Sequence, residues 1–171
     1  EGIEALHNGV IGKVHYAKAW YTNNRKSIGF GKEIPAPSTI DFDLWQGPAP
    51  RRSYRDNLIH YNWHWFWHWG TGEALNNGTH EIDVVRWGLG LDFPTAVSSE
   101  GGRFRFKDDW ETPDTQTIDI RFGDDCLVTW EGRSCNSRYT EGRDRGGIFY
   151  GDGGALETGY NGYRIFDMKN K

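Results

Sequence analysis

The chain has 171 residues and a net charge of −4, and this length is enough for one domain with a sizeable core. It has no basic stripe of the kind that nucleic acid requires, and no apolar run approaches the roughly 20 residues needed to cross a membrane. Glycine reaches 23 residues, well above the usual share of about 7%, and aromatic residues make up 15% of the chain. This composition predicts a loop-rich sheet protein with ring-lined surfaces, whose partner is a small molecule or another protein.

The first predicted elements are a short helix, Glu1–His7, and a strand, Ile11–Tyr21, which is rich in β-forming residues and follows a glycine-bounded turn. Because the sequence starts inside a helix, without an initiating methionine or a signal peptide, we expect it to be part of a longer protein whose compartment it does not specify. Asn23–Pro50 has no sustained period and is predicted to be a long loop. A loop of that length usually serves as a lid or a binding edge.

Two glycine-rich patterns do not predict nucleotide binding. Gly29 and Gly31 form a GxG, but Ile34 stands where the dinucleotide fingerprint requires its third glycine. The glycines of 151–154 are not followed by a helical pattern, so we expect a hairpin turn there rather than a phosphate-binding loop.

Cysteine and histidine spacing predicts no metal site. Cys126 and Cys135 lack the CxxC spacing of zinc sites and are either buried thiols or one bridge between neighbouring strands. His60, His64 and His68 recur at helical spacing, but no carboxylate lies in register with them, and the alternating tryptophans around them favour an extended chain.

Residues 61–69, YNWHWFWHW, alternate as an extended segment would. One side would carry Trp63, Trp65, Trp67 and Trp69, and the other His64, Phe66 and His68. Two interpretations stay open: an aromatic wall that fills space between loop and sheet, or a platform that stacks on the apolar faces of a sugar. Under the second, Trp63, His64 and Trp67 would line a substrate pocket.

Helical periodicity is clearest over Gly72–Leu89. The core side would carry Ala74, Leu75, Gly78, Ile82, Val85 and Leu89, and the opposite side Asn76, His80, Asp83 and Trp87. An ordinary solvated face would carry Lys and Glu, whereas this one carries groups that can hold a hydroxylated substrate. His80 is the candidate general base or acid because its ionisation lies near neutrality. The alternative is an interior histidine bonded to Asp83.

After this helix the period changes to two, which predicts strands. They are Ala96–Phe106, Thr115–Phe122, Asp125–Arg133, Gly147–Tyr150, Ala155–Thr158 and Tyr163–Phe166, with a tight hairpin across Gly123 and Asp124. The fold class is therefore α+β, with an open, mostly antiparallel or mixed sheet and the helices packed on one face. Its other face would be apolar, through Phe104, Phe106, Ile118, Ile120 and Trp130, and would be covered by a second copy of the chain.

The segment GTGEALNNGTHEIDVVRW resembles the part of the Gfo/Idh/MocA oxidoreductases that combines a glycine-rich turn, a helix start and G-x-H-x-x-D. The WQGPAP segment, the GGRF strand start and the GDGGAL hairpin are similar to the same family's C-terminal domain. The resemblance covers nearly the whole chain, 1–171. It implies a single substrate-binding and oligomerisation domain with a fold like the C-terminal domain of glyceraldehyde-3-phosphate dehydrogenase.

In that family a Rossmann domain precedes this one, binds NAD or NADP and supplies a lysine near the nicotinamide, and neither feature is in this chain. The family's catalytic histidine maps onto His80, and its acidic partner maps onto Asn76. An amide cannot take up a proton, so this departure puts the proton relay in doubt while leaving Asn76 able to orient a substrate hydroxyl.

The resemblance therefore implies an NAD(P)-dependent oxidoreductase of a sugar, cyclitol or related polyol, inactive as this piece alone. His80 and Asn76 would be catalytic, and Asp83, Trp63, His64 and Trp67 would contact the substrate. Two alternatives stay open: an NAD-dependent glycosidase of the same family, and a non-catalytic carbohydrate-binding or dimerisation module in which His80 is structural.

Overall fold

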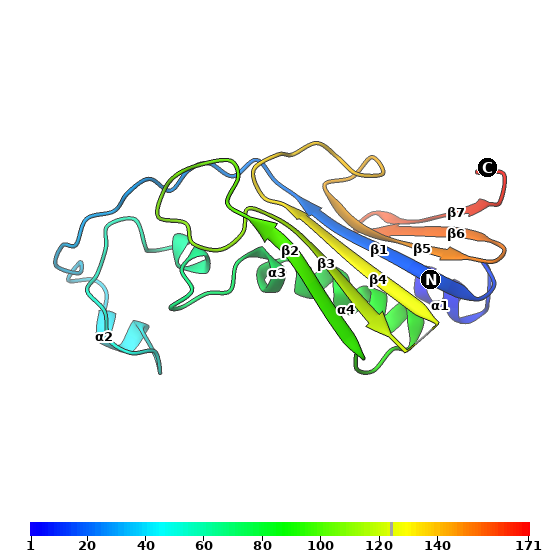
Figure 1. Ribbon diagram of the computed structural model, residues 1–171, viewed down its shortest axis with the longest axis horizontal. Helices are drawn as coiled ribbons and strands as arrows, with labels where there is room; N and C mark the ends of the chain where they lie inside the picture. Colours follow the sequence, from blue (N-terminus) through cyan, green and yellow to red (C-terminus); the bar gives the residue numbers. More distant parts are fainter. Residues whose placement is uncertain (124) are drawn as a thin grey trace.

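The computed structural model describes residues 1–123 and 125–171 and contains one seven-stranded sheet (Figure 1). The strands are β1 (Val14–Thr22), β2 (Ala96–Gly102), β3 (Thr115–Phe122), β4 (Cys126–Arg133), β5 (Arg145–Gly151), β6 (Gly154–Gly159) and β7 (Gly162–Asp167), in the spatial order β2-β3-β4-β1-β5-β6-β7. The helices are α1 (Gly2–His7), α2 (Phe42–Trp45), the 3₁₀ helix η1 (Asn62–Trp65), α3 (Glu73–Asn76) and α4 (Gly78–Leu89).

The central strand is β1, which pairs parallel with β4 and antiparallel with β5. Every other neighbouring pair of strands is antiparallel. Helix α4 packs against β1, β4 and β5, and α1 packs against α4 and β6 on the same face. The predicted α+β class, with an open mixed sheet and helices on one face, is confirmed.

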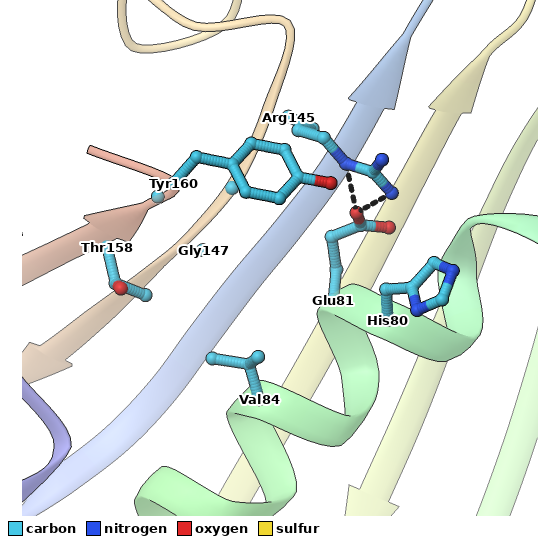
Figure 2. A pocket seen from close by; sticks show the side chains of 9 residues that line it. His80, Glu81, Val84, Arg145, Gly147, Thr158 and Tyr160 are labelled. Carbon is cyan, nitrogen blue, oxygen red and sulfur yellow. Dashed lines mark hydrogen bonds and ion pairs between the residues drawn. The ribbon is translucent and has the colours of Figure 1, made fainter. Parts of the chain in front are cut away.

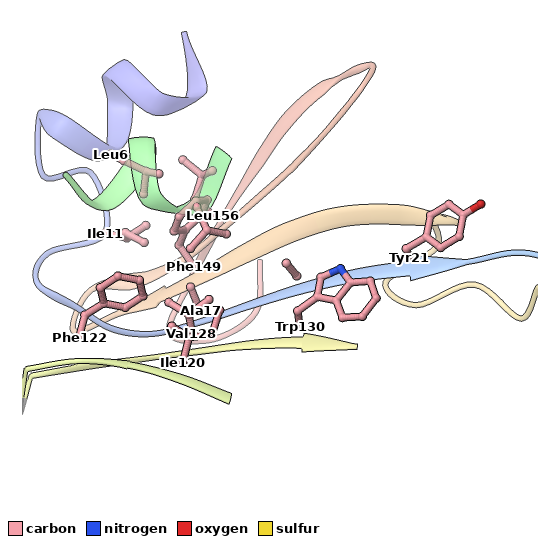
Figure 3. Packing of buried hydrophobic residues seen from close by; sticks show 12 residues of the cluster. Leu6, Ile11, Ala17, Tyr21, Ile120, Phe122, Val128, Trp130, Phe149 and Leu156 are labelled. Atoms are coloured by element: carbon pink, nitrogen blue, oxygen red, sulfur yellow. The ribbon is translucent and has the colours of Figure 1, made fainter. Parts of the chain in front are cut away.

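The core lies between this sheet and the two helices, entirely within the chain (Figure 3). Ala17 and Val128 stand opposite each other in the register and are fully buried. Two glycines let α4 approach the sheet closely: a Cβ on Gly78 would lie 3.1 Å from the Trp130 ring, and one on Gly88 would lie 2.9 Å from the Phe149 ring. Helix α4 is therefore held at a distance that larger residues would not permit.

The predicted helix over Gly72–Leu89 is divided at Asn77 into α3 and α4. The helical period is not carried across this interruption, so Leu75, expected in the core, is 60% exposed. Val85, by contrast, is fully buried as predicted.

The expected extended segment over 61–69 is wrong, because four of its residues form the 3₁₀ helix η1. The four tryptophans consequently do not share one side. Trp65 is buried and stacks on Trp110, whereas Trp67 is 60% exposed.

The expected apolar open face is also wrong. Ile118 and Ile120 stand opposite Trp130 and Val128 in the register, and all four side chains lie on the side that the helices cover. Phe104 lies beyond the end of β2 and is exposed. The register identifies which side chains share a face, but it does not say which face receives the helices.

The open face instead mixes charged pairs with aromatic and apolar side chains, among them Tyr16 stacked on Tyr150 and the exposed Leu127. Lys18 Nζ lies 2.9 Å from Glu131 Oε2, and Glu157 is buried between the guanidinium groups of Arg143 and Arg164. Strands β3 and β4 pair up to Phe122 opposite Cys126. The predicted hairpin turn between them includes Asp124, which lies outside the described residues. Cys126 and Cys135 are free thiols, not a bridge.

Residues 23–70 form an arm that projects beyond one end of the sheet (Figure 1). Carboxylates of the loop 103–114 hold this arm. Asp108 Oδ2 accepts hydrogen bonds from Ser27 Oγ and Ile28 N, and Asp109 Oδ2 accepts from Gly31 N, Arg55 Nη2 and Asn57 Nδ2. Because each carboxylate accepts from several donors, these hydrogen bonds fix the position of the arm.

Acid should release the part of the arm that Asp108 holds. Burial alone would raise the pKa of Asp108, but hydrogen bonds from Ser27 and Ile28 and the charge of Arg103 outweigh it and hold the pKa below the ordinary 3.8. A lowered pKa contributes stability that is present above 3.8 and is lost as the pH falls through the folded-state value. Amide hydrogen exchange at Ile28 should therefore accelerate, beyond its intrinsic pH dependence, as the pH falls below about 4.

The Asp108→Asn variant should show the same acceleration already at neutral pH. Its matched control is Asp43→Asn, since the Asp43 side chain lies in the same arm but is 85% exposed. Equal protection of Ile28 in the wild type and the Asp108→Asn variant would contradict the assigned role of Asp108.

Candidate functional site

A pocket of about 180 Å³ lies beside the first turns of α4 (Figure 2). Its lining is His80, Glu81 and Val84 from α4, Arg145, Gly146 and Gly147 from β5, Thr158 and Gly159 from β6, and Tyr160 from the turn that follows. The pocket thus joins the polar start of α4 to one end of the sheet.

His80 lies at the edge of this pocket and is exposed. Within the described part of the chain, its ring makes no hydrogen bond or ion pair, and neither does the exposed carboxylate of Asp83. His80 is therefore not the interior histidine bonded to Asp83 that the alternative interpretation required. An imidazole without a protein partner at a pocket edge is free to exchange a proton with a bound molecule.

The pocket wall contains a buried ion pair. Glu81 is only 6% exposed, and its Oε1 accepts a hydrogen bond of 2.7 Å from Arg145 Nε and a second bond from Arg145 Nη2. Trp130 Nε1 lies 3.4 Å from the other carboxylate oxygen. Burial raises the pKa of Glu81, and the bonds from Arg145 only partly oppose this effect. The Arg145 guanidinium also lies 5.3 Å from the centre of the Tyr160 ring.

A second buried carboxylate, Glu73, is 3% exposed and stands at the start of α3. Its Oε1 accepts a hydrogen bond of 2.6 Å from Arg25 Nε. Its Oε2 accepts from Asn76 Nδ2 at 3.2 Å and also from Asn77 Nδ2. Asn76 is therefore held by a carboxylate that lies one turn before it.

Asn77 connects the two carboxylates. It donates to Glu73 through Nδ2, and its Oδ1 accepts a hydrogen bond of 2.9 Å from Arg145 Nη2. Because Arg145 binds Glu81, one continuous network crosses the interruption between α3 and α4. Every polar atom that this network buries has a partner, which is the condition under which buried charge is tolerated.

The ring of Tyr21 lies between the two guanidinium groups, 5.9 Å from Arg25 and 5.2 Å from Arg145. Its hydroxyl accepts hydrogen bonds from Arg25 Nη2 at 3.0 Å and from Asn23 Nδ2 at 2.6 Å. Burial raises the pKa of Tyr21. Burial would lower the pKa of Arg25, but the Glu73 carboxylate and nearby tyrosines raise it overall, so Arg25 stays charged.

The aromatic residues predicted for the substrate pocket lie elsewhere. Trp63 and His64 are on η1 in the arm, and neither they nor Trp67 line the pocket of His80. Trp63 lines a separate groove of about 540 Å³ together with Trp45 and Trp69. Of the site residues predicted from the sequence, His80 alone lines the pocket beside α4; Asp83 lies one turn further along α4, and Asn76 ends α3. The three aromatic residues lie in the arm, apart from the pocket.

Sequence reasoning missed the charged residues of this region. They are Arg25, Glu73, Glu81 and Arg145. One signal was present: Glu73 and Glu81 fall within a helix whose other outward residues are neither Lys nor Glu, and a carboxylate near the core boundary requires a cation. Spacing could not identify the two arginines, because they come from the arm and from β5.

Among residues 1–123 and 125–171, no three His, Cys, Asp or Glu side chains converge to hold a metal ion. No helix in these ranges has the length and apolar character needed to cross a bilayer.

Residues 14–154 match the family model described as oxidoreductase family, C-terminal alpha/beta domain, of the Gfo/Idh/MocA group. This match covers most of the sequence, so the chain belongs to that family, and the resemblance drawn from its motifs is confirmed. No curated protein sequence matches the chain.

Solved structures of oxidoreductases share the fold. Levoglucosan dehydrogenase in complex with NADH and levoglucosan is 16% identical, with a TM-score of 0.63, over 99% of this chain and 40% of that one. The aldose-aldose oxidoreductase from Caulobacter crescentus, complexed with glycerol, is 14% identical, with a TM-score of 0.62, over 96% and 39%. The WlbA dehydrogenase from Bordetella pertussis, in complex with NADH and UDP-GlcNAcA, is 13% identical, with a TM-score of 0.58, over 96% and 41%. This chain thus spans about two fifths of the length of these relatives.

Replacing Arg145 by Met should destabilise the domain strongly. The substitution keeps an unbranched side chain but leaves the buried Glu81 carboxylate without its cation, which costs about 3–5 kcal/mol. Without Arg145, the pKa of the buried Glu81 carboxyl is raised further. A carboxyl with a raised pKa stabilises the folded state at low pH, and this contribution is lost as the pH rises. The loss in the free energy of unfolding should therefore be larger at about pH 7 than at about pH 4.5.

The matched control is Arg138→Met, because the Arg138 side chain is exposed and has no hydrogen-bond or ion-pair partner in the described part of the chain. Denaturant unfolding at both pH values measures the effect. Equal stability of the two variants would show that the Glu81–Arg145 pair does not anchor α4.

Proposed function

We propose that the whole protein is an NAD(P)-dependent oxidoreductase that acts on a sugar, cyclitol or related polyol, and that this chain is its substrate-binding and oligomerisation domain. Membership of the family supports the reaction class. The observation that carries the proposal is the exposed ring of His80, without a protein partner among the described residues, at the edge of a pocket. Neighbouring folds that bind NADH together with sugar ligands support the substrate class.

This chain carries no dinucleotide fingerprint. The Gly29-x-Gly31 pattern lies in the arm, is not joined directly to a strand and a helix, and lacks the third glycine. We assign cofactor binding mainly to a nucleotide-binding domain in the rest of the protein. A bound nicotinamide would accept a hydride, and the contribution of this chain is to bind the substrate and move the proton.

His80 is the proposed general base, which takes the proton of the substrate hydroxyl at the carbon that is oxidised. Asn76, held by Glu73, would position that hydroxyl, and Asp83, exposed one turn after His80 on α4, would bind a further hydroxyl of the substrate. Trp63, His64 and Trp67 are not included in this site, because they lie in the arm and not in α3 or α4; of the predicted residues, His80 alone lines the pocket.

Replacing His80 by Ala in the full-length protein should lower kcat/KM about 10²-fold to 10⁴-fold, the usual contribution of general acid–base catalysis. Oxidation of D-glucose, myo-inositol and glycerol, followed by reduction of NAD or NADP, measures it. The control is His15→Ala, because His15 is exposed on β1 and outside the pocket. Near-normal turnover in the His80→Ala enzyme would instead favour a binding or dimerisation module in which His80 is structural.

The open sheet face is the proposed oligomer contact. It presents Tyr16 stacked on Tyr150 and the half-exposed Lys18–Glu131 pair, and the helices lie on the opposite face. A broad sheet face of mixed polarity suits a contact between copies that combines apolar area with paired charges.

Sedimentation at tens of micromolar should show concentration-dependent association of the chain. Leu127→Glu should weaken it, because Leu127 is exposed on the open face of β4 and a carboxylate there would have to lose its hydration on association. Met168→Glu, in the exposed C-terminal segment, is the control. A monomer at every concentration would rule out this contact.

A further inference from the structure

We propose that Glu73 is a positioning residue that fixes the Asn76 amide with its carbonyl oxygen outward, so that Asn76 acts toward a substrate hydroxyl as a hydrogen-bond acceptor. This inference rests on the proposed function in its last step, the contact with substrate. Its first step, the orientation of Asn76, concerns this chain alone.

The orientation follows from hydrogen-bond chemistry. Glu73 is 3% exposed and has Arg25 on one oxygen, so its carboxylate offers only acceptors to Asn76. An amide oxygen has no hydrogen to donate, and therefore only Nδ2 of Asn76 can face the carboxylate. In the structure, Asn76 Nδ2 lies 3.2 Å from Glu73 Oε2. No described residue donates to Asn76 Oδ1, and Asn76 is half-buried. The oxygen is the end of the amide left for a ligand.

The backbone supports the same orientation. Asn76 N donates to Gly72 O at 3.0 Å and Asn77 N donates to Glu73 O at 3.0 Å, so Glu73 and Asn76 sit on adjacent positions of one helical turn. Asn77 holds the other side of the carboxylate and is itself fixed by Arg145. Glu73 consequently cannot turn away from Asn76 without leaving Arg25 Nε and Asn77 Nδ2 without their acceptors.

Glu73→Gln should reverse the orientation of the Asn76 side-chain amide. Arg25 requires an acceptor, so the carbonyl oxygen of the introduced glutamine turns toward the guanidinium and its NH₂ group turns toward Asn76. Asn76 then accepts that bond through Oδ1 and presents its own NH₂ group outward. Asn77 Nδ2, which donates to the same Glu73 oxygen in the wild type, loses its acceptor in every variant that carries Glu73→Gln. The side chain at position 76 keeps its shape but offers a donor where the wild type offers an acceptor.

Asn76→Asp should repair this defect only when Glu73 is also replaced. Alone, it puts a second carboxylate against Glu73, and two adjacent carboxylates repel until one takes up a proton. In the double variant Glu73→Gln/Asn76→Asp, one oxygen of the introduced aspartate accepts from the introduced glutamine, and the other oxygen stays outward as an acceptor. The double variant should therefore resemble the wild type more closely than either single variant does.

The orientation is tested in the isotopically labelled chain by hydrogen exchange of the Asn76 side-chain NH₂ group. In the wild type this group should exchange about 10-fold or more slowly than that of Asn161, which is exposed and serves as the internal reference. Glu73→Gln should remove the protection, and Glu100→Gln, on the exposed edge strand β2, should not. An Asn76 group that already exchanges like Asn161 in the wild type would overturn the proposal.

The contact with substrate is tested in the full-length protein with D-glucose, myo-inositol and glycerol. Glu73→Gln should raise KM by about 10-fold, with a smaller change in kcat, and the double variant should recover to within about 3-fold of the wild type. A purely structural role for Glu73 predicts lowered stability without this recovery in KM, and that result would overturn the substrate step. If His80→Ala stays active while the exchange pattern at Asn76 is as expected, the proposed function fails and the orientation by Glu73 stands.

Discussion

Two buried carboxylates, Glu73 and Glu81, determine how the polar end of the helical layer is attached to the sheet. A carboxylate at this depth is tolerated only with a cation and further donors, because desolvation of an unpaired ion costs several kcal/mol. Arg25 and Arg145 supply the cations, and Asn77 joins the two pairs. The start of α4, and with it His80, is therefore placed by hydrogen-bond geometry rather than by apolar packing alone.

This network also explains why the helix can be interrupted where it is. At Asn77 the side chain donates to one carboxylate pair and accepts from the other, so the interruption lies at the centre of the network. The apolar core begins directly after it: Gly78 rests on the Trp130 ring, and Val85 is buried one turn beyond Glu81. Polar contacts thus hold the start of α4, which borders the pocket, and apolar contacts hold the rest of the helix.

What the sequence predicted follows from local periodicity. The strands, the outward positions of Asn76, His80 and Asp83, and the class of the fold depend on side chains a few residues apart, which spacing resolves. The network was missed because Arg145 meets Glu81 across 64 positions of sequence, and Arg25 meets Glu73 across 48. The prediction of an apolar open face was wrong because alternation groups Ile118 with Ile120 but does not indicate which side of the sheet the helices cover. The 3₁₀ helix at Asn62–Trp65 was missed because the alternating tryptophans imitate a strand, whereas Trp65 is buried through its stacking on Trp110.

Asn76 stands where the resemblance to the family implies an acidic residue, and a carboxylate, Glu73, lies three residues earlier. With Glu73 present, an aspartate at position 76 would place two carboxylates on one helical turn, one of them already inside the protein. Asparagine avoids that repulsion and adds a donor for Glu73, so the two residues suit each other as a pair. The negative charge of this turn has not been lost from the protein: it lies one turn earlier, buried and bound to Arg25, where it can orient the amide but cannot itself exchange a proton with a ligand. Under the proposed function, proton transfer would fall to His80, and Asn76 would contribute direction and polarity to the bond that a substrate hydroxyl makes.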